Sequence, residues 1–130
     1  MSEWVVRLVL AGASAGCDTA LDVGSGPGKY RAPVRYVASV DGYQQAQSDR
    51  HVVGNLLDVL PTFSAGEFDL VYCLDVIEHM TKADGIRLLE NMERVAKRAV
   101  LVFTPRGFMP QESDIPWQRI CRPRDAAIRR

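Results

Sequence analysis

The chain has 130 residues, 47% hydrophobic and 25% charged, and its 16 Lys and Arg residues balance its 16 Asp and Glu residues. This length supports one domain with a substantial core but not two, and the zero net charge gives no electrostatic indication of a nucleic-acid partner. Cys17, Cys73 and Cys121 are odd in number and far apart, which favours reduced thiols over a disulfide framework or a Cys-x-x-Cys metal site.

Residues 3–11 predict a short amphipathic helix at the start of the chain. Trp4, Val5, Leu8 and Val9 fall on one helical face, which we expect to pack on a sheet. No stretch has the roughly eighteen consecutive apolar residues of a membrane span, and this segment lacks a basic leader and a clear cleavage site. We therefore expect a cytoplasmic protein without a membrane partner.

A predicted strand at residues 19–23 opens directly into alternating glycines at positions 24, 26 and 28. Glycine has no Cβ, so such a turn lets a ligand approach the backbone, and a nucleotide-like ligand is the first hypothesis. A dinucleotide fingerprint would need glycine at its sixth position, where this chain has Lys29. A P-loop would need four residues before Gly-Lys, whereas residues 25–27 alone separate Gly24 from Gly28.

The stretch ALDVGSGPG, residues 20–28, resembles motif I of the class I S-adenosylmethionine (SAM)-dependent methyltransferases. In that family the turn passes beneath the methionine part of the cofactor, and the preceding acid organises the turn or contacts the cofactor's amino group. The resemblance implies that SAM is bound by Asp22, Gly24, Ser25, Gly26 and Gly28. A helix-capping role for Asp22 and a tight turn without a ligand remain alternatives.

A second predicted strand, residues 36–40, stops at Asp41-Gly42. An acid at this place, about twenty residues beyond the first strand, can accept hydrogen bonds from both ribose hydroxyls. The resemblance implies that Gly42 and Tyr43 line the adenosine, while a plain turn acid is the alternative for Asp41.

The connections on this side are short. Pro33 leaves room for about two helical turns within residues 29–35, and residues 44–50 have little apolar periodicity, so we expect thin cover over this half of the sheet.

Residues 51–58 predict a third strand that runs into a polar turn. The resemblance implies that the Asp58 side chain contacts the exocyclic amine of adenine and that the Leu57 backbone contacts a ring nitrogen. An ordinary surface acid is the alternative interpretation of Asp58.

Residues 68–74 form the strongest apolar run in the middle of the chain and predict a buried parallel strand. With the residues that follow, the stretch FDLVYCLDVIEH, residues 68–79, resembles motif IV of the same methyltransferases. The resemblance implies that Cys73, Leu74 and Asp75 border the sulfonium side of the cofactor.

Glu78 and His79 are the candidate catalytic residues. A neighbouring carboxylate can tune an imidazole near neutral pH, so His79 could take a proton from a substrate hydroxyl. Capping or packing of the next helix is the alternative. The two residues are adjacent and no second histidine stands near them in sequence, so we expect no metal.

Thr81 predicts the cap of a helix whose apolar stripe ends near Ala96, and residues 99–104 predict a fifth strand. Strands that alternate with helical segments indicate an α/β fold: a Rossmann-like, mostly parallel five-stranded sheet flanked by helices. By resemblance this is a class I methyltransferase fold that is truncated at its C-terminus.

The family normally continues through a further helix and two strands, but residues 109–130 show no convincing pair of strands. We expect a SAM-binding domain at residues 1–110 and a basic, disordered tail at residues 111–130. The strand at 99–104 would then be an open edge, which predicts self-association through it.

These features together predict a transferase that moves the sulfonium methyl of SAM to an unidentified small-molecule acceptor. Two alternatives remain open: a SAM-binding module without catalytic activity, favoured by the absent C-terminal strands, and an NAD-type dinucleotide-binding domain, disfavoured by Lys29.

Overall fold

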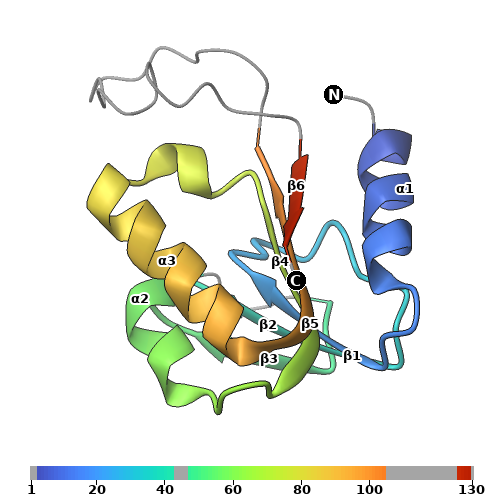
Figure 1. Ribbon diagram of the computed structural model, residues 1–130, viewed down its shortest axis with the longest axis horizontal. Coiled ribbons are helices and arrows are strands. Elements are labelled where there is room, and N and C mark those ends of the chain that lie inside the picture. Colours follow the sequence, from blue (N-terminus) through green and yellow to red (C-terminus); the bar gives the residue numbers. More distant parts are fainter. Residues whose placement is uncertain (1–2, 43–46, 105–125, 130) are drawn as a thin grey trace.

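The computed structural model describes residues 3–42, 47–104 and 126–129. Helices flank a central sheet on both faces (Figure 1). In chain order the elements are α1 (Glu3–Ser14), β1 (Thr19–Val23), β2 (Tyr36–Asp41), β3 (Arg50–Val53), α2 (Leu56–Val59), η1 (a 3₁₀ turn, Leu60–Thr62), β4 (Phe68–Leu74), η2 (a 3₁₀ turn, Ile77–His79), α3 (Lys82–Val95), β5 (Ala96–Phe103) and β6 (Ala126–Arg129).

The sheet has the strand order β3-β2-β1-β4-β5-β6, with β1 to β5 parallel and β6 antiparallel to β5. The chain therefore builds outward from β1 to β3, and then returns to place β4 on the other side of β1. Ligands of open α/β sheets bind at such a reversal, beside the carboxyl ends of the strands. The predicted Rossmann-like sheet of five parallel strands is confirmed.

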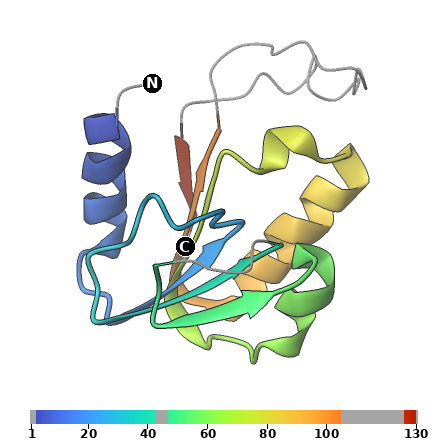
Figure 2. The ribbon, with the colours of Figure 1, turned by 180° about the vertical axis from the view of Figure 1, so that it is seen from behind.

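The two faces of the sheet have separate cores. On one face, Leu88, Met92 and Val95 of α3 pack against Leu21 and Val71. On the other face, Leu10 of α1 packs with Tyr72 and Leu101. Figures 1 and 2 show α1 and α3 on opposite sides of the strands. Burying apolar residues on both faces explains the near-continuous hydrophobic runs of β1 and β4.

The inward face of α1 differs from the predicted one. Val6 and Leu10 are buried, whereas Trp4 is 66% exposed and Leu8 is 64% exposed. The helix carries apolar side chains around most of its circumference, so helical periodicity does not select one face. The inward face is the one whose Leu10 joins the core that contains Tyr72.

The connection after the glycine turn also differs from the prediction. Residues 24–35, all of which the structure describes, form no helix, so the expected two turns between Lys29 and Arg35 are absent. Pro33 lacks an N–H group, and Ala32 donates its own N–H to the hydroxyl of Tyr72 instead of to a helical carbonyl.

Two other element boundaries differ from those predicted from the sequence. β3 ends at Val53, and the end of the stretch predicted as a strand and polar turn, residues 51–58, lies in α2. The cap of α2 is Asn55, whose side-chain oxygen accepts a hydrogen bond from the Leu57 N–H at 2.9 Å. β5 begins at Ala96, earlier than expected. The predicted cap of α3 is confirmed, because the Thr81 hydroxyl accepts from the Asp84 N–H at 3.2 Å.

β5 is not an open edge over its second half. Val100 to Phe103 pair with β6, so the prediction that no later segment would pair with the fifth strand is wrong there. A four-residue strand with the sequence AAIR has too little alternation to be recognised from sequence. The predicted boundary near residue 110 and most of the predicted tail lie outside the described residues.

Within the described ranges, no helix is both long and apolar enough to cross a membrane.

Candidate functional site

A cavity of about 790 Å³ opens at the carboxyl ends of the central strands, a size typical of small-molecule sites. It lies at the sheet reversal, where the first βα connection and the loop after β4 meet. Its lining residues are Gly24, Gly26, Asp41, Gly42, Gly54, Asn55, Leu56, Asp75, Val76, His79 and Met80.

The glycine turn forms one wall, and its glycines have different tasks. Gly24 and Gly26 both have positive φ, at 72° and 55°. A Cβ on Gly24 would lie 2.4 Å from a methyl group of Val76, so Gly24 is required for close packing between the turn and the loop after β4. A Cβ on Gly26 would meet no protein atom within 4 Å. Bare backbone therefore faces open space at Gly26.

Asp41, the last residue of β2, holds this turn. Its Oδ2 atom accepts a hydrogen bond from the Gly26 N–H at 2.7 Å. The N–H of Gly24 also donates to the Val40 carbonyl at 2.8 Å. The end of β2 thus fixes the backbone of the turn and brings a carboxylate to the cavity wall beside Gly26 and Gly42.

Asp22, on β1, does not line the cavity. Its side chain is buried, and burial raises the pKa of this carboxyl to about 8, with the charge of Asp41 adding to the rise and a hydrogen bond with Tyr72 opposing it. A carboxyl with this pKa is mostly neutral at pH 7. The helix-capping interpretation fails, because no helix follows within residues 24–35.

The end of β4 supplies another wall. Cys73 is buried, and desolvation raises the pKa of its thiol, so it is an unreactive core residue. Leu74 packs on the core shared with α1. Asp75 lines the cavity at a φ of 56°, a conformation that is rare for residues other than glycine, and its N–H donates to the Phe103 carbonyl at 2.8 Å. Backbone strain of this kind clusters at binding sites.

Glu78 and His79 follow at the mouth of the cavity. Glu78 is buried, and its Oε2 atom accepts a hydrogen bond from the Thr104 hydroxyl at 3.1 Å. Its Oε1 atom lies 3.4 Å from Nε2 of His79, whose side chain is 60% exposed and lines the cavity. Desolvation raises the pKa of Glu78. A buried, anchored carboxylate therefore orients an imidazole that solvent can reach.

The structure brings six of the predicted site residues to the cavity and leaves others outside it. Those that line it are Gly24, Gly26, Asp41, Gly42, Asp75 and His79. Those placed elsewhere among the described residues are Asp22, Ser25, Gly28, Leu57, Asp58, Cys73, Leu74 and Glu78. Tyr43 lies outside the described residues.

Sequence reasoning missed the wall formed by Gly54, Asn55 and Leu56. An Asn directly before an apolar pair is a helix N-cap signal that could have found it. It also missed Tyr72, whose hydroxyl contacts Asp22, and for that contact no local sequence pattern exists. Over the described part of the chain, no cluster of three or more His, Cys, Asp or Glu side chains could hold a metal ion.

Comparison with solved structures shows the fold. A SAM-dependent methyltransferase from Archaeoglobus fulgidus superposes with a TM-score of 0.66 at 18% identity, over 81% of this chain and 54% of the other. The YcgJ protein from Bacillus subtilis gives 0.64 at 17% identity, over 82% and 52%. Phosphoethanolamine N-methyltransferase 1 from Haemonchus contortus, solved with phosphoethanolamine and S-adenosylhomocysteine, gives 0.62 at 15% identity, over 75% and 24%.

The chain thus spans about half the length of the first two of these proteins. No curated protein matches the sequence significantly. A family model described as a methyltransferase domain matches residues 21–104, a range that contains both the glycine turn and the loop after β4. The chain belongs to this methyltransferase-domain family.

Proposed function

We propose that this chain binds SAM in the cavity at the strand ends and transfers its sulfonium methyl to a small-molecule acceptor. One observation carries the proposal: at Gly26 the backbone faces open space beside the carboxylate of Asp41. A nucleoside with a charged tail needs both a close approach to backbone and an acceptor for its hydroxyls. Membership of the methyltransferase-domain family supports the same assignment.

The cavity residues fit such a cofactor. Gly24 and Gly26 would hold its tail against the turn, and the Asp41 carboxylate would accept hydrogen bonds from the ribose hydroxyls. Asn55 and Leu56, at the start of α2, line the cavity beside Gly54 and would contact the adenine. We assign this contact to them in preference to Leu57 and Asp58, which lie outside the lining.

SAM supplies an electrophilic methyl group, so the protein's own task is to orient the acceptor and keep water from the reaction path. His79 stands at the cavity mouth with Glu78 behind it, and Glu78 is held by Thr104 at the end of β5. In the proposed reaction Nδ1 of His79 takes the proton of an acceptor hydroxyl, and Glu78, which lies beside Nε2, stabilises the imidazolium that forms.

Two alternatives have different signatures. A SAM-binding module without activity would bind the cofactor but produce no S-adenosylhomocysteine with any acceptor. An NAD-binding domain is not favoured, because Lys29 stands where that fingerprint has glycine and the family model is that of a methyltransferase.

Calorimetric titration of the whole chain with SAM, S-adenosylhomocysteine and NAD, run in parallel, tests the proposal. We expect saturable binding of the first two and none of NAD. Binding of NAD alone, or of none of the three, would contradict it.

A further inference from the structure

The side chain of Tyr72, in the middle of the sheet, contacts both ends of the glycine turn. Its hydroxyl donates to the Tyr30 carbonyl at 3.2 Å and accepts from the Ala32 N–H at 3.2 Å. It also shares a hydrogen bond with the carboxyl of Asp22. Asp22 comes just before the turn and Tyr30 just after it, so one buried oxygen joins the two chain segments that frame residues 24–28.

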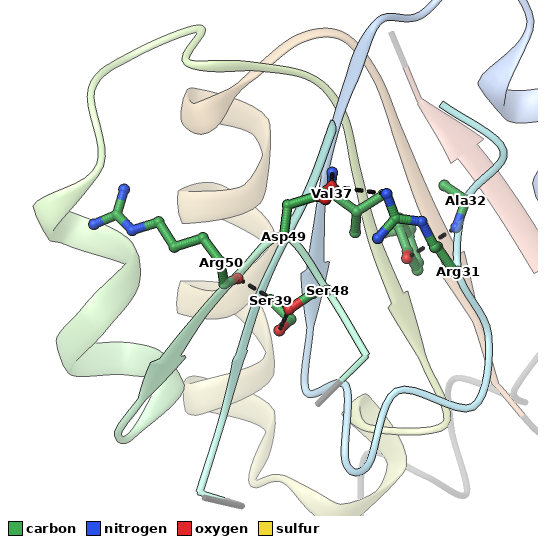
Figure 3. Close-up of polar contacts among 8 residues, drawn as sticks. Arg31, Ala32, Val37, Ser39, Ser48, Asp49 and Arg50 are labelled. Carbon is green, nitrogen blue, oxygen red and sulfur yellow. Dashed lines mark hydrogen bonds and ion pairs between the residues drawn. The ribbon is translucent and has the colours of Figure 1, made fainter. Parts of the chain in front are cut away.

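The segment after the turn depends on this contact because no helix stabilises it. Residues 29–35 are here called the cover segment. They pack into the core on the α1 side of the sheet, through Tyr30, Ala32 and Val34. The cover segment also makes an ion pair at the surface. Arg31 donates to the Asp49 carboxylate at 2.7 Å, and the same oxygen accepts from the Val37 N–H at 2.8 Å (Figure 3). That ion pair is exposed to solvent on both sides and contributes little.

We propose that Tyr72 is a positioning residue for the cofactor site: its hydroxyl, bonded to Tyr30 and Ala32 after the glycine turn and to Asp22 before it, joins the two ends of the turn and holds the turn in its ligand-binding shape. The inference rests on the proposed function, since the turn's ligand is taken to be SAM. Tyr72 is fully buried and does not line the cavity, so it acts through the turn and not by contact with the ligand.

The first test compares two tyrosines. Tyr72→Phe keeps the ring but removes the hydroxyl. Tyr36→Phe removes the same atom at the start of β2, where no hydrogen bond to a described residue involves the Tyr36 hydroxyl. At pH 7 we expect S-adenosylhomocysteine to bind Tyr72→Phe about 10-fold more weakly than wild type, because the buried N–H of Ala32 and the half-buried carbonyl of Tyr30 both lose their partner. Tyr36→Phe should bind like wild type.

Amide exchange supplies a readout that does not depend on a ligand. The Ala32 N–H should exchange faster in Tyr72→Phe than in Tyr36→Phe, while the strand amides of β1 and β4 remain protected. Equal affinity of the two Phe variants would overturn the inference and leave the proposed function standing. A wild-type chain that binds neither SAM nor S-adenosylhomocysteine would overturn both.

Discussion

At the level of single residues, Asp41 both stabilises the glycine turn and lines the cavity. Its carboxylate fixes the Gly26 N–H, and it also lines the cavity where ribose hydroxyls would bind. The residue was predictable from sequence, because an acid at the end of the second strand has a known use in nucleotide-binding sheets. Its bond to Gly26 was not predictable, because that contact depends on how β1 and β2 align side by side.

Replacing Asp41 should weaken cofactor binding. Asp41→Ala removes both the acceptor for the ligand and the anchor of the turn, so the binding free energy of S-adenosylhomocysteine should fall by about 1.5–3 kcal/mol. Asp84→Ala, which removes an acid from the exposed face of α3, is the control. Titration calorimetry measures both, and equal dissociation constants would return Asp41 to the role of a turn acid.

His79 should affect the chemical step and not cofactor binding. If the imidazole takes the acceptor's proton, His79→Ala should lower turnover by about 10²–10⁴-fold with unchanged affinity for SAM. His51→Ala removes the other histidine, which hydrogen-bonds Ser39 between β2 and β3, away from the cavity lining. Rates per folded molecule that fall equally in both variants would show that His79 has a structural role only.

At the level of elements, the turn after β1 and the loop after β4 are packed against each other. Gly24 and Val76 are the contact, and they leave no space for a Cβ. The bounds of β1 and β4 follow from their hydrophobic runs. The extended conformation of the cover segment could not be predicted in this way. Its Ala32 N–H is hydrogen-bonded by Tyr72, which lies 40 residues further along the chain, on β4.

A double-mutant cycle tests this packing. Gly24→Ala places a methyl group 2.4 Å from the Val76 side chain and at positive φ, so it should lower the free energy of unfolding by roughly 2–4 kcal/mol. Val76→Ala removes the clashing methyls, so the double variant should recover about 1 kcal/mol relative to the sum of the single effects. Denaturant unfolding measures all four proteins, and strict additivity would show that Gly24 is required only for its φ.

At the level of the whole molecule, the cavity lies where the strand order reverses, and β6 pairs with one edge of the sheet. The parallel arrangement of five strands was predicted, because apolar runs alternate with helical segments along the sequence. β6 was missed, because a four-residue strand with the sequence AAIR has too little alternation to be recognised without its pairing partner β5. The inward face of α1 was mistaken for a related reason: the sheet, not the helix, selects it.

Removal of β6 should expose the edge of β5. A chain shortened to residues 1–104 leaves the backbone groups of Val100 to Phe103 without the partner strand, and the strand is strongly apolar. We expect this shortened chain to self-associate more than the 130-residue chain at equal concentration. Size-exclusion chromatography with light scattering measures the oligomeric state of both chains. If both are monomers at the same concentration, β6 is not needed to cover the edge of β5.

The most direct test of cofactor binding in this cavity is a titration of two glycine variants with S-adenosylhomocysteine. Gly26→Val fills the open space beside Asp41, whereas Gly66→Val introduces the same side chain at a similar positive φ of 67°, in the turn before β4 and away from the cavity lining. Both variants carry backbone strain, so strain cancels in the comparison. The account predicts that Gly26→Val abolishes binding while Gly66→Val binds as the wild type does. Normal affinity in Gly26→Val would contradict it.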